Sequence, residues 1–162
     1  MTSVHLLHAG YCDDRTASSV VLVRDGDALI VVDPGMVARR SLILDPLREL
    51  GVAPEAEVVD FWARYKDDLW LDHDGEGYRP SPRTELWLTP GHTEEDLTFM
   101  VEAEDGVYAM THLWWRADRT PDLDPVCADD ASIRVHRERV LAAADVVIPG
   151  HGEPFRVQRR AR

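Results

Sequence analysis

The sequence has few cysteines, few basic residues and no long apolar run, and each shortage excludes a class of protein. Cys12 and Cys127 are too few and too far apart for a disulfide framework or a Cys-x-x-Cys pair, so we expect a reducing, cytoplasmic setting. The N-terminal residues contain no basic leader and no apolar stretch of signal length. No segment approaches the roughly 20 apolar residues of a membrane span, so we expect no membrane partner.

The shortage of basic residues argues against nucleic acid as a partner. Eighteen Lys and Arg stand against 30 Asp and Glu, which gives a formal net charge of −12. Such a charge repels phosphate backbones and anionic lipid. We therefore expect a small-molecule substrate, and a monomer or a homodimer. Basic residues cluster only in 156–162, which we expect to be a solvated C-terminal tail.

The length and the pattern of apolar residues predict one mixed domain. A chain of 162 residues with 44% hydrophobic content can build one sizeable core, which we place in residues 1–155. Apolar runs and turn residues predict strands at 4–7, 20–23, 28–32, 84–88, 97–101, 106–110 and 145–148. Helical spacing predicts helices at 40–50 and at about 128–143, the latter capped by Asp129 or Asp130. Residues 54–83 are irregular, and we expect a loop there with one short strand.

Strand 28–32 is almost wholly apolar and delivers Asp33 just before Pro34 and Gly35. This pattern is typical of a central, buried strand with a polar residue at its C-terminal end.

Two segments, 86–92 and 146–151, share one design, in which an apolar strand leads through Pro-Gly to a histidine, His92 or His151. His112 follows a third apolar strand in an equivalent place. A single histidine near a strand end is more often a surface or capping residue, but the repetition favours a metal site for His92 and His151. For His112 both interpretations stay open. Three imidazoles suffice for a zinc ion that keeps one position open for water.

Three motifs, in this order, carry a family resemblance: Val-Val-Asp-Pro-Gly at 31–35, Thr-Pro-Gly-His-Thr at 89–93 and Ile-Pro-Gly-His-Gly at 148–152. Through them the chain resembles the metallo-β-lactamase superfamily, and within it the small metallo-β-lactamase domain-containing protein 1 type. The resemblance implies an α/β (α+β) fold, the αββα sandwich, with one or two zinc ions that activate water to attack an ester, amide, thioester or phosphodiester. It also implies that His92 and His151 are ligands of the first and the second zinc, and that Asp33 is an acid behind the ligands.

Two departures from the family pattern weaken the implied site. The family's His-x-His-x-Asp-His segment is absent, and residues 50–62, where it belongs, contain no histidine. The fold would then be incomplete by one strand-loop-helix unit of roughly 30 residues. The family's metal-bridging Gly-Asp is replaced by Thr111 and His112, and a neutral imidazole offers one lone pair per nitrogen at most, so it cannot bridge in the same way.

Three hypotheses follow for the function. In the first, the chain is a zinc-dependent hydrolase by descent with a partly occupied site of His92, His112 and His151. In the second, it is a non-catalytic binding or regulatory module. In the third, it is an active enzyme shortened at 54–57 by a deletion or a faulty gene model. The run Asp72-His73-Asp74 is better explained as a solvated turn than as a displaced ligand set, and His5, His8 and His136 as structural residues. The fold alone cannot choose the bond that is cleaved.

Overall fold

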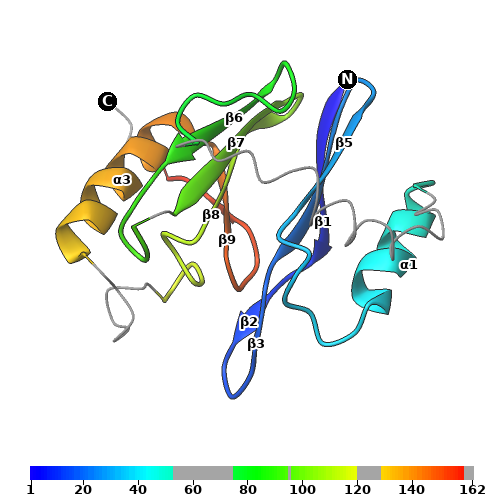
Figure 1. Cartoon of the computed structure of the whole chain (residues 1–162), viewed down its shortest axis with the longest axis horizontal. Helices are drawn as coiled ribbons and strands as arrows, with labels where there is room; N and C mark the ends of the chain where they lie inside the picture. Colours follow the sequence, from blue (N-terminus) through cyan, green and yellow to red (C-terminus); the bar gives the residue numbers. More distant parts are fainter. Residues whose placement is uncertain (53–74, 95, 120–128, 159–162) are drawn as a thin grey trace.

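The computed structural model describes residues 1–52, 75–94, 96–119 and 129–158. Its strands form two sheets (Figure 1). The first is antiparallel, in the order β1-β4-β5, with β1 Thr2–His8, β4 Val20–Asp25 and β5 Ala28–Val32. The second has the order β10-β9-β8-β7-β6, with β6 Thr84–Leu88, β7 Leu97–Ala103, β8 Gly106–Thr111, β9 Val146–Pro149 and β10 Phe155–Arg156. A small hairpin joins β2 (Tyr11–Cys12) to β3 (Thr16–Ala17).

Strand alternation sends apolar side chains to both faces of each sheet, so each sheet packs on two sides. On β4, Val21 and Val23 face the second sheet and meet Phe99, Met110 and Ile148. The other face of the first sheet packs against helix α1 (Ser41–Glu49), where Leu22 meets Leu47. The two sheets therefore face each other across the main core.

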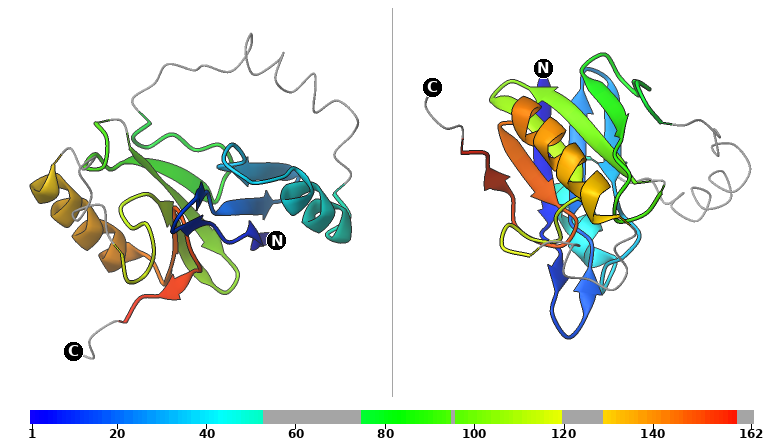
Figure 2. Two further views of the ribbon diagram at one scale, coloured as in Figure 1. Left: turned by 90° about the horizontal axis from the view of Figure 1, so that it is seen from below. Right: turned by 90° about the vertical axis from the view of Figure 1, so that its left-hand side faces the viewer.

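Helix α3 (Asp130–Ala143) covers the outer face of the second sheet. Its Ile133 and Val140 are fully buried against residues that include Ala109 and Val147. Asp129 caps the helix, because its carboxylate accepts a hydrogen bond from the Ala131 amide at 3.0 Å. The result is the predicted αββα layering, with a helix on each outer face (Figure 2).

Most predicted elements are confirmed within a few residues, and β5 and β6 match their predicted ranges. Three short strands, β2, β3 and β10, were not predicted. The predicted burial of β5 is wrong: among the described residues β5 pairs only with β4, at the sheet edge, and Leu29 is 53% exposed. An apolar run thus marks an edge strand here, because no other strand in the described part of the chain pairs with β5 on the side away from β4. The short strand expected within 54–83 falls mostly outside the described residues.

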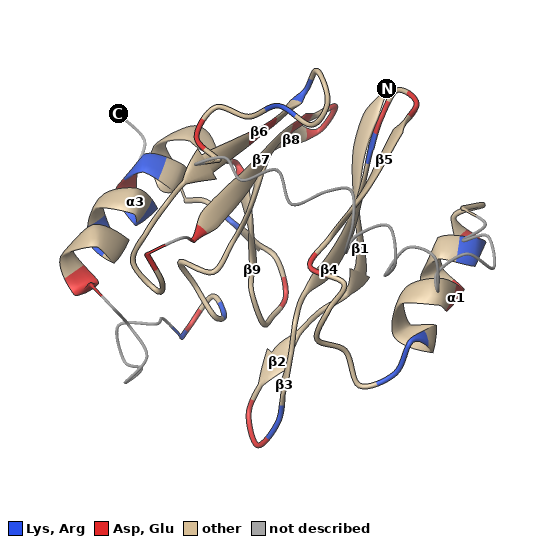
Figure 3. Cartoon of the chain, in the orientation of Figure 1, with Lys and Arg blue, Asp and Glu red and all other residues tan. Residues whose placement is uncertain are grey.

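β10 extends the second sheet to Arg156, the first residue of the segment predicted as a tail, and Arg156 pairs with Val146. Charged residues lie mainly in turns and on the helices, and few lie within the strands (Figure 3). In the part of the chain that the structure describes, no helix is long and apolar enough to cross a membrane.

Candidate functional site

Strand direction explains why the three candidate histidines come together. β6 and β8 both run antiparallel to β7, and β9 runs parallel to β8, so β6, β8 and β9 all point the same way. His92, His112 and His151 follow the C-terminal ends of these strands and therefore emerge at the same sheet edge. The ring centroid of His112 lies 5.9 Å from that of His92 and 5.1 Å from that of His151. His112 is thus the middle member of a cluster of three imidazoles.

His151 is held by the hairpin of the first half of the chain. Its Nδ1 lies 3.0 Å from the carbonyl oxygen of Ala17, and because a carbonyl can only accept, Nδ1 carries the proton. Nε2 of the neutral ring therefore keeps its lone pair. Ser19 ties the same turn in place, since its hydroxyl donates to the Gly152 carbonyl and accepts from the Gly152 amide, both at 3.1 Å. A histidine whose far nitrogen donates to a backbone carbonyl is the usual form of a metal ligand.

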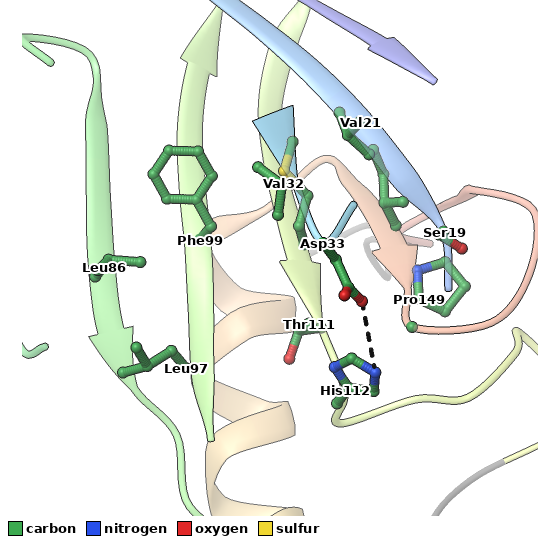
Figure 4. Close-up of a pocket in the computed structure, with 13 residues that line it drawn as sticks. Ser19, Val21, Val32, Asp33, Leu86, Leu97, Phe99, Thr111, His112 and Pro149 are labelled. Atoms are coloured by element: carbon green, nitrogen blue, oxygen red, sulfur yellow. Dashed lines mark ion pairs between the residues drawn. The ribbon is translucent and has the colours of Figure 1, made fainter. Parts of the chain in front are cut away.

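His112 packs directly on Gly150. A Cβ at position 150 would lie 2.6 Å from the His112 Nε2, so only glycine leaves room for this ring. Burial lowers the pKa of His112, and the neighbouring Asp33 carboxylate opposes that effect. The Asp33 Oδ2 lies 4.0 Å from the His112 Nε2 (Figure 4). The balance favours the neutral ring, the form that can bind a metal.

Asp33 itself adopts an unusual backbone conformation. Its φ of 52° makes it the one residue other than glycine, among those described, in the left-handed region. Asp tolerates this region better than most residues, and such strain is often found at functional sites. The turn directs the carboxylate toward His112.

His92 completes the cluster but is held less tightly. Its Nδ1 is buried and finds no hydrogen-bond partner among the described residues. The Asp96 carboxylate lies 3.5 Å away, but it is already engaged by the amide and hydroxyl of Thr93, at 3.1 and 2.8 Å. A buried ring nitrogen that makes no hydrogen bond fits a side chain that binds a metal ion.

Two features of the site were not singled out by the sequence. Trp115 contacts both outer histidines, with ring centroids 6.3 Å from His92 and 5.8 Å from His151. Behind the cluster, the buried hydroxyls of Thr89, Thr98 and Thr111 form a chain with two links of 2.9 Å. Trp115 comes three residues after His112, and this position could have placed it at the site. The sequence holds no such signal for the three threonines, because their pairing depends on strand register.

The cluster fits a zinc ion in ligand type but is not arranged as a full three-ligand site. With Zn–N bonds of about 2.1 Å, two imidazoles on one ion have centroids roughly 5 to 6 Å apart, close to the two spacings found here. Yet the described residues contain no group of three or more His, Cys, Asp or Glu side chains placed to hold a metal ion. His73 lies outside the described residues. That His92, His112 and His151 are metal ligands stays a prediction.

A cavity of about 320 Å³ lies beside the cluster, between the two sheets (Figure 4). Most of its wall is apolar, including Val32 from the first sheet and Phe99 from the second. Its polar lining residues are Ser19, Asp33, Thr111 and His112, and Figure 4 shows Ser19, Asp33 and His112 on the side away from Leu86 and Phe99. The histidine cluster therefore borders a mainly apolar chamber.

The αββα layers and their motif-bearing strand ends define the class of protein: the chain has the metallo-β-lactamase fold, and its sequence is similar to proteins named for a metallo-β-lactamase domain. A solved structure from Thermotoga maritima, described as a "putative metallo-beta-lactamase", superposes with a TM-score of 0.71 over 96% of this chain and 99% of that one. At 16% identity this likeness establishes the fold alone. No family model matches the sequence.

The chain is similar, more narrowly, to vertebrate proteins named metallo-beta-lactamase domain-containing protein 1. The Xenopus laevis protein is 27% identical, over 96% of this chain and 82% of its own length. The Homo sapiens protein is 37% identical, over 72% and 47%, and the Rattus norvegicus protein 30% identical, over 82% and 64%. The chain thus spans from about half to about four fifths of the length of these relatives.

Proposed function

We propose that the chain is a metal-dependent hydrolase by descent, with a weakened zinc site at His92, His112 and His151 and impaired activity. The observation that carries this proposal is the convergence of three imidazoles at one sheet edge, with the Nε2 lone pair of His151 available. The fold alone would not carry it, because this fold hosts many reactions.

The residues of the site have separate tasks in this proposal. The Ala17 carbonyl fixes the tautomer of His151, and burial keeps His112 neutral. Asp33 would stabilise positive charge that develops near His112. A bound zinc ion would lower the pKa of water toward neutrality and polarise the scissile group. Trp115 would limit the access of bulk water from its side of the cluster.

The lack of the His-x-His-x-Asp-His segment supports weak binding. The alignment with the frog relative runs over 191 residues but takes in 96% of this 162-residue chain, so about 35 positions have no counterpart here. That number matches the size of one strand-loop-helix unit. Mutation of a residue that hydrogen-bonds to a metal ligand typically reduces metal affinity 10- to 100-fold, so loss of the ligands themselves should reduce it further. A shortfall of this size is also what a deletion would leave, and sequencing the encoding DNA around codons 54–57 would test that alternative.

Zinc content is the direct test. The protein is produced in zinc-supplemented cells, and its metal is measured by mass spectrometry beside a His92→Ala/His151→Ala variant and a control, His5→Ala/His136→Ala, outside the cluster. We expect sub-stoichiometric zinc in the wild type and the control and none in the cluster variant. Hydrolysis of ester, thioester, amide and phosphodiester substrates should be slow and follow the zinc. A wild type with no more zinc than the cluster variant would overturn the proposal.

A second candidate is a non-catalytic binding module on the same fold. The absence of a metal-holding group among the described residues, beside a well-formed cavity, favours it. It predicts ligand binding that is the same with and without zinc, and no hydrolysis at any zinc concentration.

A further inference from the structure

We propose that the cavity between the sheets binds the apolar chain of an uncharged acyl compound, such as a medium-chain ester, thioester or amide, with its carbonyl toward His112. That water attacks this carbonyl and the adjoining acyl C–O, C–S or C–N bond is cleaved rests on the proposed hydrolase function, whereas the binding itself does not. The cavity has apolar walls from both sheets, and its polar residues Ser19, Asp33 and His112 lie on the side away from Leu86 and Phe99, which we call its polar end.

The wall favours a hydrocarbon. Val32 lines it from β5, Leu86 from β6 and Phe99 from β7, and Figure 4 shows the β6 and β7 residues across the chamber from Val32. A methylene group takes up about as much space as a water molecule, roughly 30 Å³, so the cavity of about 320 Å³ has room for about ten non-hydrogen atoms, such as the eight carbons and two head-group atoms of octanamide. An apolar chamber without polar partners holds water poorly, which favours an apolar occupant.

The polar end favours an uncharged head group. The Asp33 carboxylate lines the cavity there, 4.0 Å from the His112 Nε2, and would repel an anion. A free fatty acid would therefore bind less well than its ester or amide. In hydrolysis, one water is added across the acyl bond to give the carboxylic acid and the alcohol, thiol or amine, and Asp33 would then repel the ionised acid product.

The methionines provide reporters for a binding test. Met110 lines the cavity, Met100 points to the opposite face of the same sheet, and Met36 is 51% exposed. Protein labelled with 13C-methyl methionine is titrated with butanamide, hexanamide and octanamide and followed by NMR. A metal chelator is present throughout, so that zinc does not affect the result. We expect the Met110 signal to shift with little change at Met100 and Met36. Affinity should rise about four-fold for each added CH2, which corresponds to about 0.8 kcal/mol per CH2.

Adjacent residues of β5 give matched variants. Val32→Phe fills the cavity, while Val31→Phe adds the same side chain on the other face, where Val31 is 36% exposed. Octanamide binding should fall at least ten-fold in Val32→Phe and stay near the wild-type value in Val31→Phe. Octanoate at neutral pH should bind the wild type more weakly than octanamide.

Equal shifts at all methionines, an affinity independent of chain length, or octanoate binding tighter than octanamide would each overturn the proposal. The wild-type titration keeps it testable if Val32→Phe does not fold. A protein without zinc or hydrolysis that still binds octanamide through Met110 would refute the proposed function and leave this inference intact.

Discussion

Each histidine of the cluster depends on residues that are not histidine. The Ala17 carbonyl sets the tautomer of His151, and the missing side chain of Gly150 makes the space that the His112 ring fills. His92 has weaker support, since its buried Nδ1 makes no hydrogen bond with the described residues and only the Asp96 carboxylate lies near it, at 3.5 Å. Two of the three imidazoles are therefore positioned in advance, and the third is the one that a bound ion would have to fix.

Gly150→Ala should displace the His112 ring. The new Cβ would lie 2.6 Å from Nε2, and relief of that overlap must move either the ring or the turn. We expect changed His112 ring signals in NMR spectra and a loss of about 1–3 kcal/mol in the free energy of unfolding. Gly35→Ala is the control, because a Cβ there meets nothing within 4 Å among the described residues. Unchanged His112 signals in Gly150→Ala would show that the ring is not confined by this glycine.

At the scale of elements, side-chain hydrogen bonds hold the strand ends that carry the site. The threonine chain links β7 to β8 through Thr98 and Thr111 and reaches Thr89 just after β6. Away from the histidine cluster, Asp25 at the end of β4 links the first sheet to the segment that leads into β6 of the second sheet. Its carboxylate accepts from the Thr2 hydroxyl at 2.8 Å and from the Arg83 amide at 2.9 Å.

Thr98→Val should destabilise the fold without changing its shape. The substitution keeps the volume but leaves the buried Thr89 and Thr111 hydroxyls short of a partner, which typically costs about 1–3 kcal/mol. Urea denaturation measures the loss. Thr16→Val, at an exposed position of β3, should change little. Equal stability of the two variants would mean that the threonine chain contributes nothing.

Asp25→Asn should lower stability in a pH-dependent way. The Arg83 amide and the Thr2 hydroxyl hold the pKa of Asp25 below its usual 3.8, so the folded state prefers the carboxylate. Its stabilisation is present above about pH 4 and is lost as pH falls through the lowered pKa. The stability gap between wild type and Asp25→Asn, measured by denaturant titration, should therefore be largest near neutral pH and close in acid. A gap that widens toward acid would contradict this assignment.

The sequence predicted most elements because their signals are local. Apolar runs and turn residues located β1 and β4 to β9, and the pair Asp129 and Asp130 located the start of α3. The Pro-Gly-His repeats named His92 and His151, and strand direction explains why they meet. The edge position of β5 could not be predicted, because an apolar strand has the same local pattern whether or not another strand lies beside it. The threonine chain and the role of Gly150 depend on register between distant segments.

At the scale of the whole molecule, β5 forms one edge of the first sheet in the part of the chain that the structure describes. β5 pairs with β4 alone among the described residues, and it exposes Leu29 by 53% and Val31 by 36%. Natural sheets usually protect an apolar edge of this kind. The exposed edge and the roughly 35 alignment positions without a counterpart both support a chain that lacks one structural unit of its relatives.

The central claim, a metal site that persists in weakened form, is tested most directly by thermal unfolding at increasing zinc concentration. A ligand that binds only the folded state stabilises it by RT ln(1 + [L]/Kd). For the wild type and the His5→Ala/His136→Ala control we expect no shift of the midpoint at submicromolar zinc. At concentrations well above Kd we expect a rise of about 3–6 °C for each tenfold increase in zinc. His92→Ala/His151→Ala should show no rise. An unfolding midpoint that already rises at submicromolar zinc, or one that rises equally in the His92→Ala/His151→Ala variant, would contradict the account.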